Sequence, residues 1–189
     1  MAYNPRIHHR RSIRLQGYDY AQAGMYYLTL TTHGRERLFG EISANEMHLS
    51  DFGKIVLEEW QRTSVVRPEV ELDEFVIMPD HVHGIMIIRA ERNGVLCRGV
   101  SPYAPTRKSS DRVTPFRSPS RTLGAIIRGF KGASTKRINA LRCTPCAPVW
   151  QRNYYEHIIR DGDDLDRIRA YIASNPDEWA ERDDLKMNQ

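Results

Sequence analysis

The sequence predicts an α+β fold in which helices pack on one face of an antiparallel sheet, with a further helix added at the C-terminal end. Segments rich in β-branched and aromatic residues alternate along the chain with segments whose apolar residues recur at helical spacing. Turn-forming Pro, Gly and Asp separate these segments. The composition, 40% apolar and 28% charged over 189 residues, is that of a globular domain with a hydrophobic core.

The first predicted strand, helix and hairpin lie in residues 25–63. Residues 25–32, MYYLTLTT, favour a strand because aromatic and β-branched residues dominate them. Residues 37–50 carry turn residues at their centre and predict a hairpin or an irregular excursion. Residues 50–63 predict a helix capped by Ser50 or Asp51, because their apolar residues recur at helical spacing.

A tight hairpin is predicted next. Residues 70–78, VELDEFVIM, form its first strand, and Pro79-Asp80 forms the turn. The second strand covers residues 83–89 and can start as early as His81. Residues 91–121 lack periodicity and are rich in Pro, Ser and Arg, which predicts a long loop that is either an insertion or a binding element.

The last third of the chain predicts two helices around one strand. Ser120 opens a helical pattern that ends near Leu141. Residues 149–160 are β-rich at both ends and predict a strand. A helix capped by Asp163 or Asp164 follows, and Pro176 is expected to stop it. Beyond it we expect a polar, acidic tail in which Trp179 is a docking anchor.

The order β, α, β, β, α, β, α fits a ferredoxin-like antiparallel sheet with two helices on one face. The last helix is then an addition to that core. We expect one domain over residues 1–189, with a basic N-terminal arm at 1–20 and the loop at 91–121 as its two irregular parts.

Positive charge is concentrated in two parts of the chain. The net charge is +4, but residues 1–16 alone carry +4 and residues 91–157 carry +10, while the remaining segments are acidic. This layout indicates a surface that meets nucleic-acid phosphates, the alternative being a solvated loop and tail. The candidate DNA-binding residues are Arg6, Arg10, Arg11, Arg14, Arg128, Lys131, Lys136 and Arg137.

Composition also favours the cytoplasm. No apolar stretch is long enough for a membrane span, and the first 20 residues lack the apolar core of a secretory signal. The chain has three cysteines, a small and odd number that argues against a disulfide scaffold. We therefore expect a cytoplasmic protein with no membrane partner.

His81-Val82-His83 is the sharpest local motif. On a strand the two imidazoles share one face, with Cα atoms about 7 Å apart, and can converge on one metal ion while Val82 points into the opposite layer. The alternative is a pair of polar residues on a solvated hairpin face. A metal site also needs a third ligand. Asp80 can orient a histidine as a hydrogen-bond acceptor or simply form the turn.

Tyr171 and Asn175 share a face of the last predicted helix because they lie four residues apart. The phenol is a potential nucleophile and the amide oxygen a potential ligand. The alternatives are a packing residue and a C-terminal cap. On the preceding strand, Tyr155 and His157 share one face and Tyr154 the other, which is typical of ordinary strand residues, with His157 as a spare ligand.

The cysteine pair Cys143-Thr-Pro-Cys146 has metal-site spacing, but no second pair accompanies it. A structural zinc site would therefore lack ligands. Cys97 lies far away in the loop.

The segments FVIMPDHVHGIMII and VWQRNYYEHIIRDGDDLDRIRAYIASNP resemble the single-tyrosine HUH transposases, and most closely the REP-associated tyrosine transposases. The openings RIHHRRSIRLQGYDY and YYLTLTTHGRERLFGEI resemble the same branch. The resemblance covers most of the chain outside residues 91–121. One departure is Asp80, where this branch commonly carries Asn, so the added carboxylate bears on metal affinity.

The resemblance implies a catalytic set of His81, His83 and Tyr171, with Tyr171 as nucleophile. It implies a divalent ion, Mg²⁺ or Mn²⁺, held by His81, His83 and Asn175; imidazole ligands favour Mn²⁺ somewhat. Its reaction would be cleavage and rejoining of single-stranded DNA next to hairpins of repetitive extragenic palindromes, through a 5′-phosphotyrosine. A monomer is favoured over a dimer. The alternatives are a hairpin-binding protein without cleavage and a metal phosphodiesterase that uses water.

Overall fold

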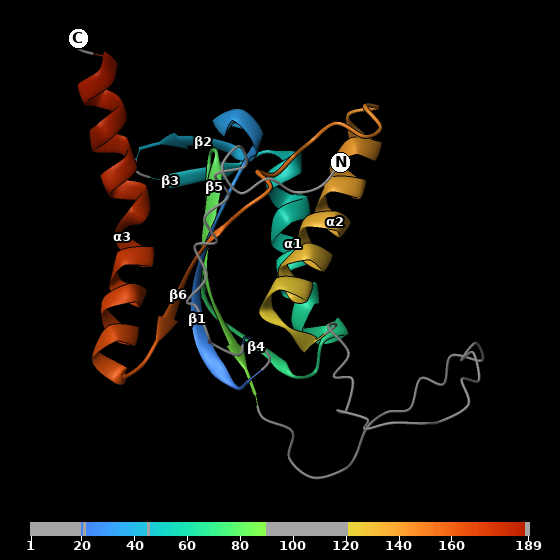
Figure 1. The fold of residues 1–189 in the computed structure, drawn as a ribbon. Helices are drawn as coiled ribbons and strands as arrows, with labels where there is room; N and C mark the ends of the chain where they lie inside the picture. Colours follow the sequence, from blue (N-terminus) through green and yellow to red (C-terminus); the bar gives the residue numbers. More distant parts are fainter. Residues whose placement is uncertain (1–19, 21, 45, 90–120, 188–189) are drawn as a thin grey trace, which may run out of the picture.

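The computed structural model describes residues 20, 22–44, 46–89 and 121–187, with side chains described as far as Trp179. The predicted basic arm and most of the predicted 91–121 loop lie outside the described residues. Within them, a central sheet carries helices on both faces (Figure 1).

The sheet has four strands, all antiparallel to their neighbours. They are β1 (Gly24–Thr31), β4 (Val70–Met78), β5 (His81–Ile88) and β6 (Tyr155–Ile159). Their order across the sheet is β4-β5-β1-β6, with β1 and β5 in the centre. This is the ferredoxin-like arrangement that the element order predicts, and it confirms the α+β fold class.

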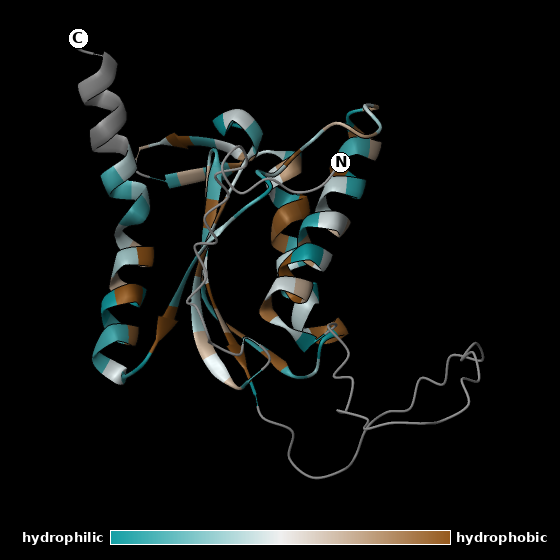
Figure 2. Ribbon diagram, viewed as in Figure 1, coloured by the Kyte–Doolittle hydropathy of each residue, from teal (hydrophilic) through white to brown (hydrophobic). Residues whose placement is uncertain are grey.

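Two layers of helix enclose the sheet. Helices α1 (Asp51–Val66) and α2 (Leu123–Leu141) cover one face, and α3 (Gly162–Met187) covers the other (Figure 1). The larger core lies between the sheet and the α1–α2 pair, where Leu28, Trp60 and Phe130 are buried. A smaller cluster under α3 is built on Ile85 and Ile172. The helices turn apolar residues toward the sheet in both layers (Figure 2).

Local sequence explains where the helices begin. The Ser50 hydroxyl accepts a hydrogen bond from the Gly53 amide at 3.1 Å and so caps α1 as predicted. Helix α2 begins at Leu123, three residues later than the expected start at Ser120, because the Thr122 hydroxyl caps it by accepting from the Ala125 amide at 3.2 Å.

The segment between β1 and α1 contains a short 3-10 helix η1 (His33–Arg35) and a two-stranded hairpin, β2 (Gly40–Ser43) with β3 (Glu46–Leu49). This confirms a hairpin where the sequence left a hairpin or an irregular excursion open. Gly40 has a φ of 143°, and a Cβ there would lie 2.0 Å from the His48 carbonyl oxygen, so this position requires glycine.

The predicted strand over 149–160 is shorter in the structure, where β6 starts at Tyr155. The Lys131 ammonium on α2 donates to the carbonyl oxygens of Gln151 and Asn153 at 2.8 and 2.9 Å. These two carbonyl groups therefore accept hydrogen bonds from a side chain and not from the backbone of a neighbouring strand. An isolated bridge between Thr32 and Trp150 is what remains of pairing there.

The expectation that Pro176 ends the last helix is wrong, because α3 continues through it to Met187. A proline inside a helix loses one backbone hydrogen bond and costs about 3 kcal/mol. Contacts before and after Pro176 offset this cost. Ile172, before the proline, is buried between α3 and the sheet, and Trp179, after it, contacts His81. Trp179 is thus an anchor within the helix and not in a polar tail.

Among the described residues, no helix combines the length and the apolar character that crossing a membrane requires.

Candidate active site

His81 and His83 lie on the face of β5 that α3 covers, while Val82 points into the larger core on the other face. The alternation predicted from the sequence is confirmed. Both imidazoles are buried, with 8% and 4% of their surfaces exposed. Their Nε2 atoms are 3.0 Å apart. Two ring nitrogens thus converge on one point beneath α3.

The other ring nitrogen of His81 faces Asp80. The Nδ1 and Oδ1 atoms are 2.5 Å apart, and the second carboxylate oxygen lies 3.5 Å from the Arg35 guanidinium. Burial opposes ionisation of Asp80, but the hydrogen bond with His81 and the charge of Arg35 outweigh it and lower the pKa of the carboxyl group. An ionised carboxylate can only accept, so the Nδ1–H group of His81 donates the hydrogen bond to Asp80. In the neutral form of that ring the lone pair then lies on Nε2.

The other ring nitrogen of His83 faces β1. Its Nδ1 atom lies 2.7 Å from the Tyr27 hydroxyl and 3.0 Å from the Thr29 hydroxyl. Burial and the neighbouring His81 lower the pKa of His83 to about 3, so the ring is neutral at physiological pH. When Nδ1 carries the proton and donates to either hydroxyl, the lone pair of His83 also lies on Nε2.

Helix α3 presents Tyr171, Asn175 and Trp179 at intervals of four residues, hence on one face. The ring of Tyr171 lies 5.4 Å from His83 between centroids, and the ring of Trp179 lies 5.4 Å from His81. Asn175 is 6% exposed and lies one turn from each. Because α3 continues, Asn175 is not a C-terminal cap.

The donor set fits a divalent ion. Two imidazoles and one amide oxygen would supply ligands, and Asp80 backs one imidazole in the carboxylate–histidine arrangement typical of metal sites. Ligands about 2.1 Å from an ion at adjacent corners of an octahedron lie about 3.0 Å apart, which is the separation of the two Nε2 atoms. Among the described residues, no group of three His, Cys, Asp or Glu side chains could hold a metal. Asn175 stays the third ligand that the resemblance implies.

Other candidate residues from the sequence lie elsewhere. Nε2 of His157 is 2.8 Å from Asp164 Oδ2 at the start of α3, so this histidine has its own partner. Cys143 and Cys146 are exposed free thiols in the turn after α2. Tyr154 packs against the larger core, as an ordinary strand residue would.

Pattern reasoning did not identify Tyr27, Thr29 or Tyr155 as site residues. Thr29 is directly opposite His83 in the β1–β5 register, and Tyr155 is opposite Thr29 in β6. The ring of Tyr155 meets Tyr27 edge-on, with centroids 6.2 Å apart. Only the strand pairing brings these residues together, and the sequence carries no signal of a register between strands so far apart.

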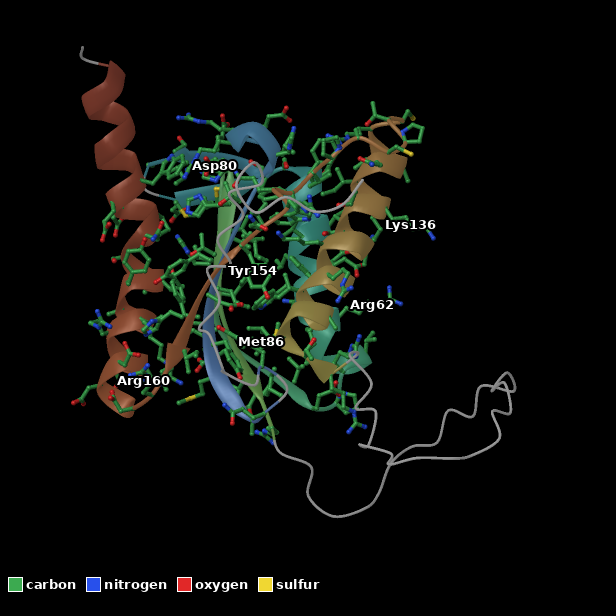
Figure 3. The ribbon with its side chains drawn as sticks, in the orientation of Figure 1. Arg62, Asp80, Met86, Lys136, Tyr154 and Arg160 are labelled. Atoms are coloured by element: carbon green, nitrogen blue, oxygen red, sulfur yellow. The ribbon has the colours of Figure 1, made fainter. Side chains whose placement is uncertain are left out.

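The predicted DNA-binding residues of α2 differ in their environment. Arg128 and Lys136 are exposed, and Lys136 points away from the helix (Figure 3). Lys131 is half-buried and bonded to backbone carbonyls. Arg137 forms ion pairs with Glu58 and Glu59 on α1, the latter at 2.9 Å. Arg6, Arg10, Arg11 and Arg14 lie outside the described residues.

Comparison with known proteins gives relatives along nearly the whole chain. No model of a known protein family matches the sequence. A Haemophilus influenzae protein of uncharacterised function is 42% identical over 186 residues, 98% of each chain. A second H. influenzae protein, named as a candidate REP-associated tyrosine transposase, is 24% identical over 158 residues, 84% of this chain and 73% of the other.

A solved structure shares the fold. It is a REP-associated tyrosine transposase bound to a REP hairpin, and the match covers 89% of this chain and 74% of the other, with a TM-score of 0.56 and 16% identity. The sequence relative and the solved structure point to the same group of proteins, which is also the one that the HVH and YIASNP segments resemble. This chain is therefore similar in sequence to a protein named as a candidate REP-associated tyrosine transposase, and it shares the fold of a solved REP-associated tyrosine transposase.

Proposed function

We propose that this protein is a metal-dependent single-stranded DNA endonuclease and strand transferase that acts next to DNA hairpins through a covalent 5′-phosphotyrosine at Tyr171. The observation that carries the proposal is the contact between Tyr171 and His83, 5.4 Å between ring centroids, beside two imidazole Nε2 atoms 3.0 Å apart. A hairpin-bound relative of the same fold supports DNA as the substrate class.

Tyr171 suits the role of nucleophile because it is 38% exposed although it borders a buried histidine pair. Its phenolic oxygen would attack the scissile phosphorus while the bond to the 3′ oxygen breaks. The products are a 5′-phosphotyrosine and a 3′ hydroxyl group that receives a proton. The reaction conserves one phosphoester bond, so the 3′ hydroxyl can attack the phosphotyrosine and rejoin strands without an external energy source.

His81, His83 and Asn175 would hold Mg²⁺ or Mn²⁺, which when bound polarises a phosphate and offsets the negative charge that develops on it. Asp80 would orient His81, and Tyr27 with Thr29 would orient His83. Ile85 and Ile172 belong to the buried apolar cluster under α3 on the same face of the sheet. The hydrogen bonds of Asp80, Tyr27 and Thr29 support these orienting roles.

A covalent adduct tests the proposal directly. We would mix 3′-end-labelled single-stranded hairpin DNA with wild type and with Tyr171→Phe, with and without Mn²⁺, and separate the products under denaturing conditions. A labelled protein band that requires both the metal and Tyr171 is the expected result. An adduct formed by Tyr171→Phe would exclude this nucleophile, and cleaved DNA without any adduct would point to a water-using phosphodiesterase.

Hairpin binding without cleavage is the second candidate, and one observation favours it. The ring of Trp179 packs against His81 while the Arg37 guanidinium lies over the indole, 5.7 Å from its centroid. The histidine pair is thereby covered on that side. Tight binding of the hairpin on a native gel, with no adduct and no cleavage at any Mn²⁺ concentration, would support this function instead.

A further inference from the structure

A groove of about 1100 Å³ lies between α2 and residues 147–154, on the face of the sheet opposite to the histidine pair. One wall is the outer side of α2 from Thr122 to Asn139, and the other is the segment that leads into β6. Tyr154 lies between α2 and the sheet (Figure 3). The groove is thus adjacent to an edge strand, since β6 is the last strand in the sheet order.

The rim of this groove carries positive charge. Arg128, Lys136 and Arg152 line it and are exposed, and none of them has a recorded ion pair within the part of the chain that the structure describes. Glu156, half-buried, is the acid among the lining residues. Elsewhere most cations face an acid, as do Lys54, Arg62, Arg67, Arg89, Arg137, Arg167 and Arg169.

A fourth cation fixes the shape of the groove. The Lys131 ammonium donates to the carbonyls of Gln151 and Asn153 and lies 5.5 Å from the centroid of the Tyr154 ring. Burial lowers the pKa of Lys131 to about 8, so the group still carries its charge on most molecules at pH 7. The two walls are therefore joined by a charged side chain.

The groove and the candidate active site meet at the edge of the sheet. Tyr154, just before β6, packs against the larger core, while Tyr155, the first residue of β6, contacts Tyr27 on the other face of the sheet. Tyr155 is 53% exposed, and its ring edge contacts Tyr27, which in turn contacts the ring of Tyr171 at 6.3 Å. An exposed aromatic ring thus stands between the basic groove and the proposed nucleophile.

We propose that this groove binds the sugar-phosphate backbone of DNA and that Tyr155 stacks on an unpaired base where the strand crosses the edge of β6 toward Tyr171. The inference rests on the proposed function only for the role of Tyr171. Unpaired arginines and lysines along a groove suit phosphates, and an exposed aromatic ring suits any base, since every base has a π-face.

Backbone binding predicts a change in salt dependence. We would measure the affinity of a fluorescent DNA hairpin with a single-stranded arm over a salt series, in the Tyr171→Phe background so that no cleavage occurs. Loss of two phosphate contacts in Arg128→Gln/Arg152→Gln should reduce the slope of log K against log salt by about 1.8. The control Lys54→Gln/Arg62→Gln removes the same charge from α1 at residues that already have acid partners.

Base stacking is tested by Tyr155→Ala and Tyr155→Phe. The alanine variant should bind the hairpin with its single-stranded arm about fivefold or more weakly, and a blunt hairpin as well as before, because only the arm reaches the edge of β6. The phenylalanine variant keeps the stacking ring and should restore the affinity. Equal loss on both DNAs would contradict the assignment of Tyr155 to an unpaired base.

These experiments distinguish a failure of the groove proposal from a failure of the proposed cleavage. An unchanged salt slope in the groove variant, or the same change in the control, would overturn the groove proposal even if wild type forms the tyrosine adduct. Conversely, the predicted changes in slope and stacking would uphold the groove even if wild type formed no adduct, in which case only the proposed cleavage would fail. Circular dichroism of each variant checks that it is folded.

Discussion

The hydroxyl group of Tyr27 lies 2.7 Å from Nδ1 of His83, and the two rings stack with centroids 5.6 Å apart. A single residue of β1 thus orients this imidazole through both its hydroxyl group and its ring. The partner on the other histidine is a carboxylate, Asp80. The two imidazoles are therefore oriented by different chemistry, although their Nε2 atoms meet at one point.

Tyr27→Phe should weaken metal binding while leaving the ring packing in place. It removes the hydroxyl that accepts from or donates to Nδ1, and the loss of such a partner typically costs 10- to 100-fold in metal affinity. Thr29 remains 3.0 Å from the same nitrogen, so we expect about tenfold. Calorimetric titration with Mn²⁺ measures this. Tyr155→Phe, whose ring also contacts Tyr27, is the matched control and should bind Mn²⁺ as wild type does.

His83→Ala should abolish adduct formation together with its dependence on metal. It removes one of the two imidazoles and leaves Tyr171 and the DNA-binding surface in place, so the hairpin should still bind. The measurement is the denaturing adduct assay beside a native binding assay. If the variant formed the adduct at the wild-type rate in the presence of a chelator, the metal site proposed here would be wrong.

Gly84→Ala should destabilise the fold. A Cβ at this position would lie 2.6 Å from the Trp60 ring and 2.8 Å from the Phe75 ring, which stack on each other with centroids 4.5 Å apart. Overpacking of this kind costs about 1–3 kcal/mol. Urea denaturation should show it as a lower midpoint. Gly129→Ala is the control: no atom lies within 4 Å of the added Cβ, so alanine should stabilise this helix position by about 0.5–1 kcal/mol.

Asp164→Asn should lower the stability of the fold near neutral pH and have little effect at acid pH, where the wild-type carboxyl group is protonated. The hydrogen bond with His157, followed by that with Arg167, lowers the pKa of Asp164 below its usual value near 3.9. A lowered pKa means that the ionised carboxylate stabilises the fold above the unfolded value and loses that effect as the pH falls through the folded one. Thermal melts from pH 3 to pH 7 should show the largest difference between variant and wild type at the upper end. A difference independent of pH would mean that charge is not the cause.

Most features that could be predicted from the sequence depend on residues that lie close together in it. The alternation of His81 and His83, the spacing of Tyr171 and Asn175, and the cap at Ser50 depend only on local periodicity, and the structure confirms each arrangement. The ferredoxin-like order followed from the sequence of elements.

The parts that could not be predicted depend on contacts between distant segments. Tyr27 and Thr29 reach His83 only through the β1–β5 register, across more than fifty residues of chain. Lys131 ends the pairing before β6 from a different element, and packing by Trp179 keeps α3 helical beyond Pro176. In each case a tertiary contact outweighed the local preference.

The placement of both histidines within a central strand limits how the site can move. Strand β5 is paired along its length to β4 on one side and β1 on the other, so the backbone at His83 cannot shift without breaking two ladders. The backbone amides of this strand should exchange their hydrogens with solvent on the timescale of global unfolding. The histidines are thus held as rigidly as the core itself, and adjustment to a substrate falls to α3 and to the side chains that it brings to them.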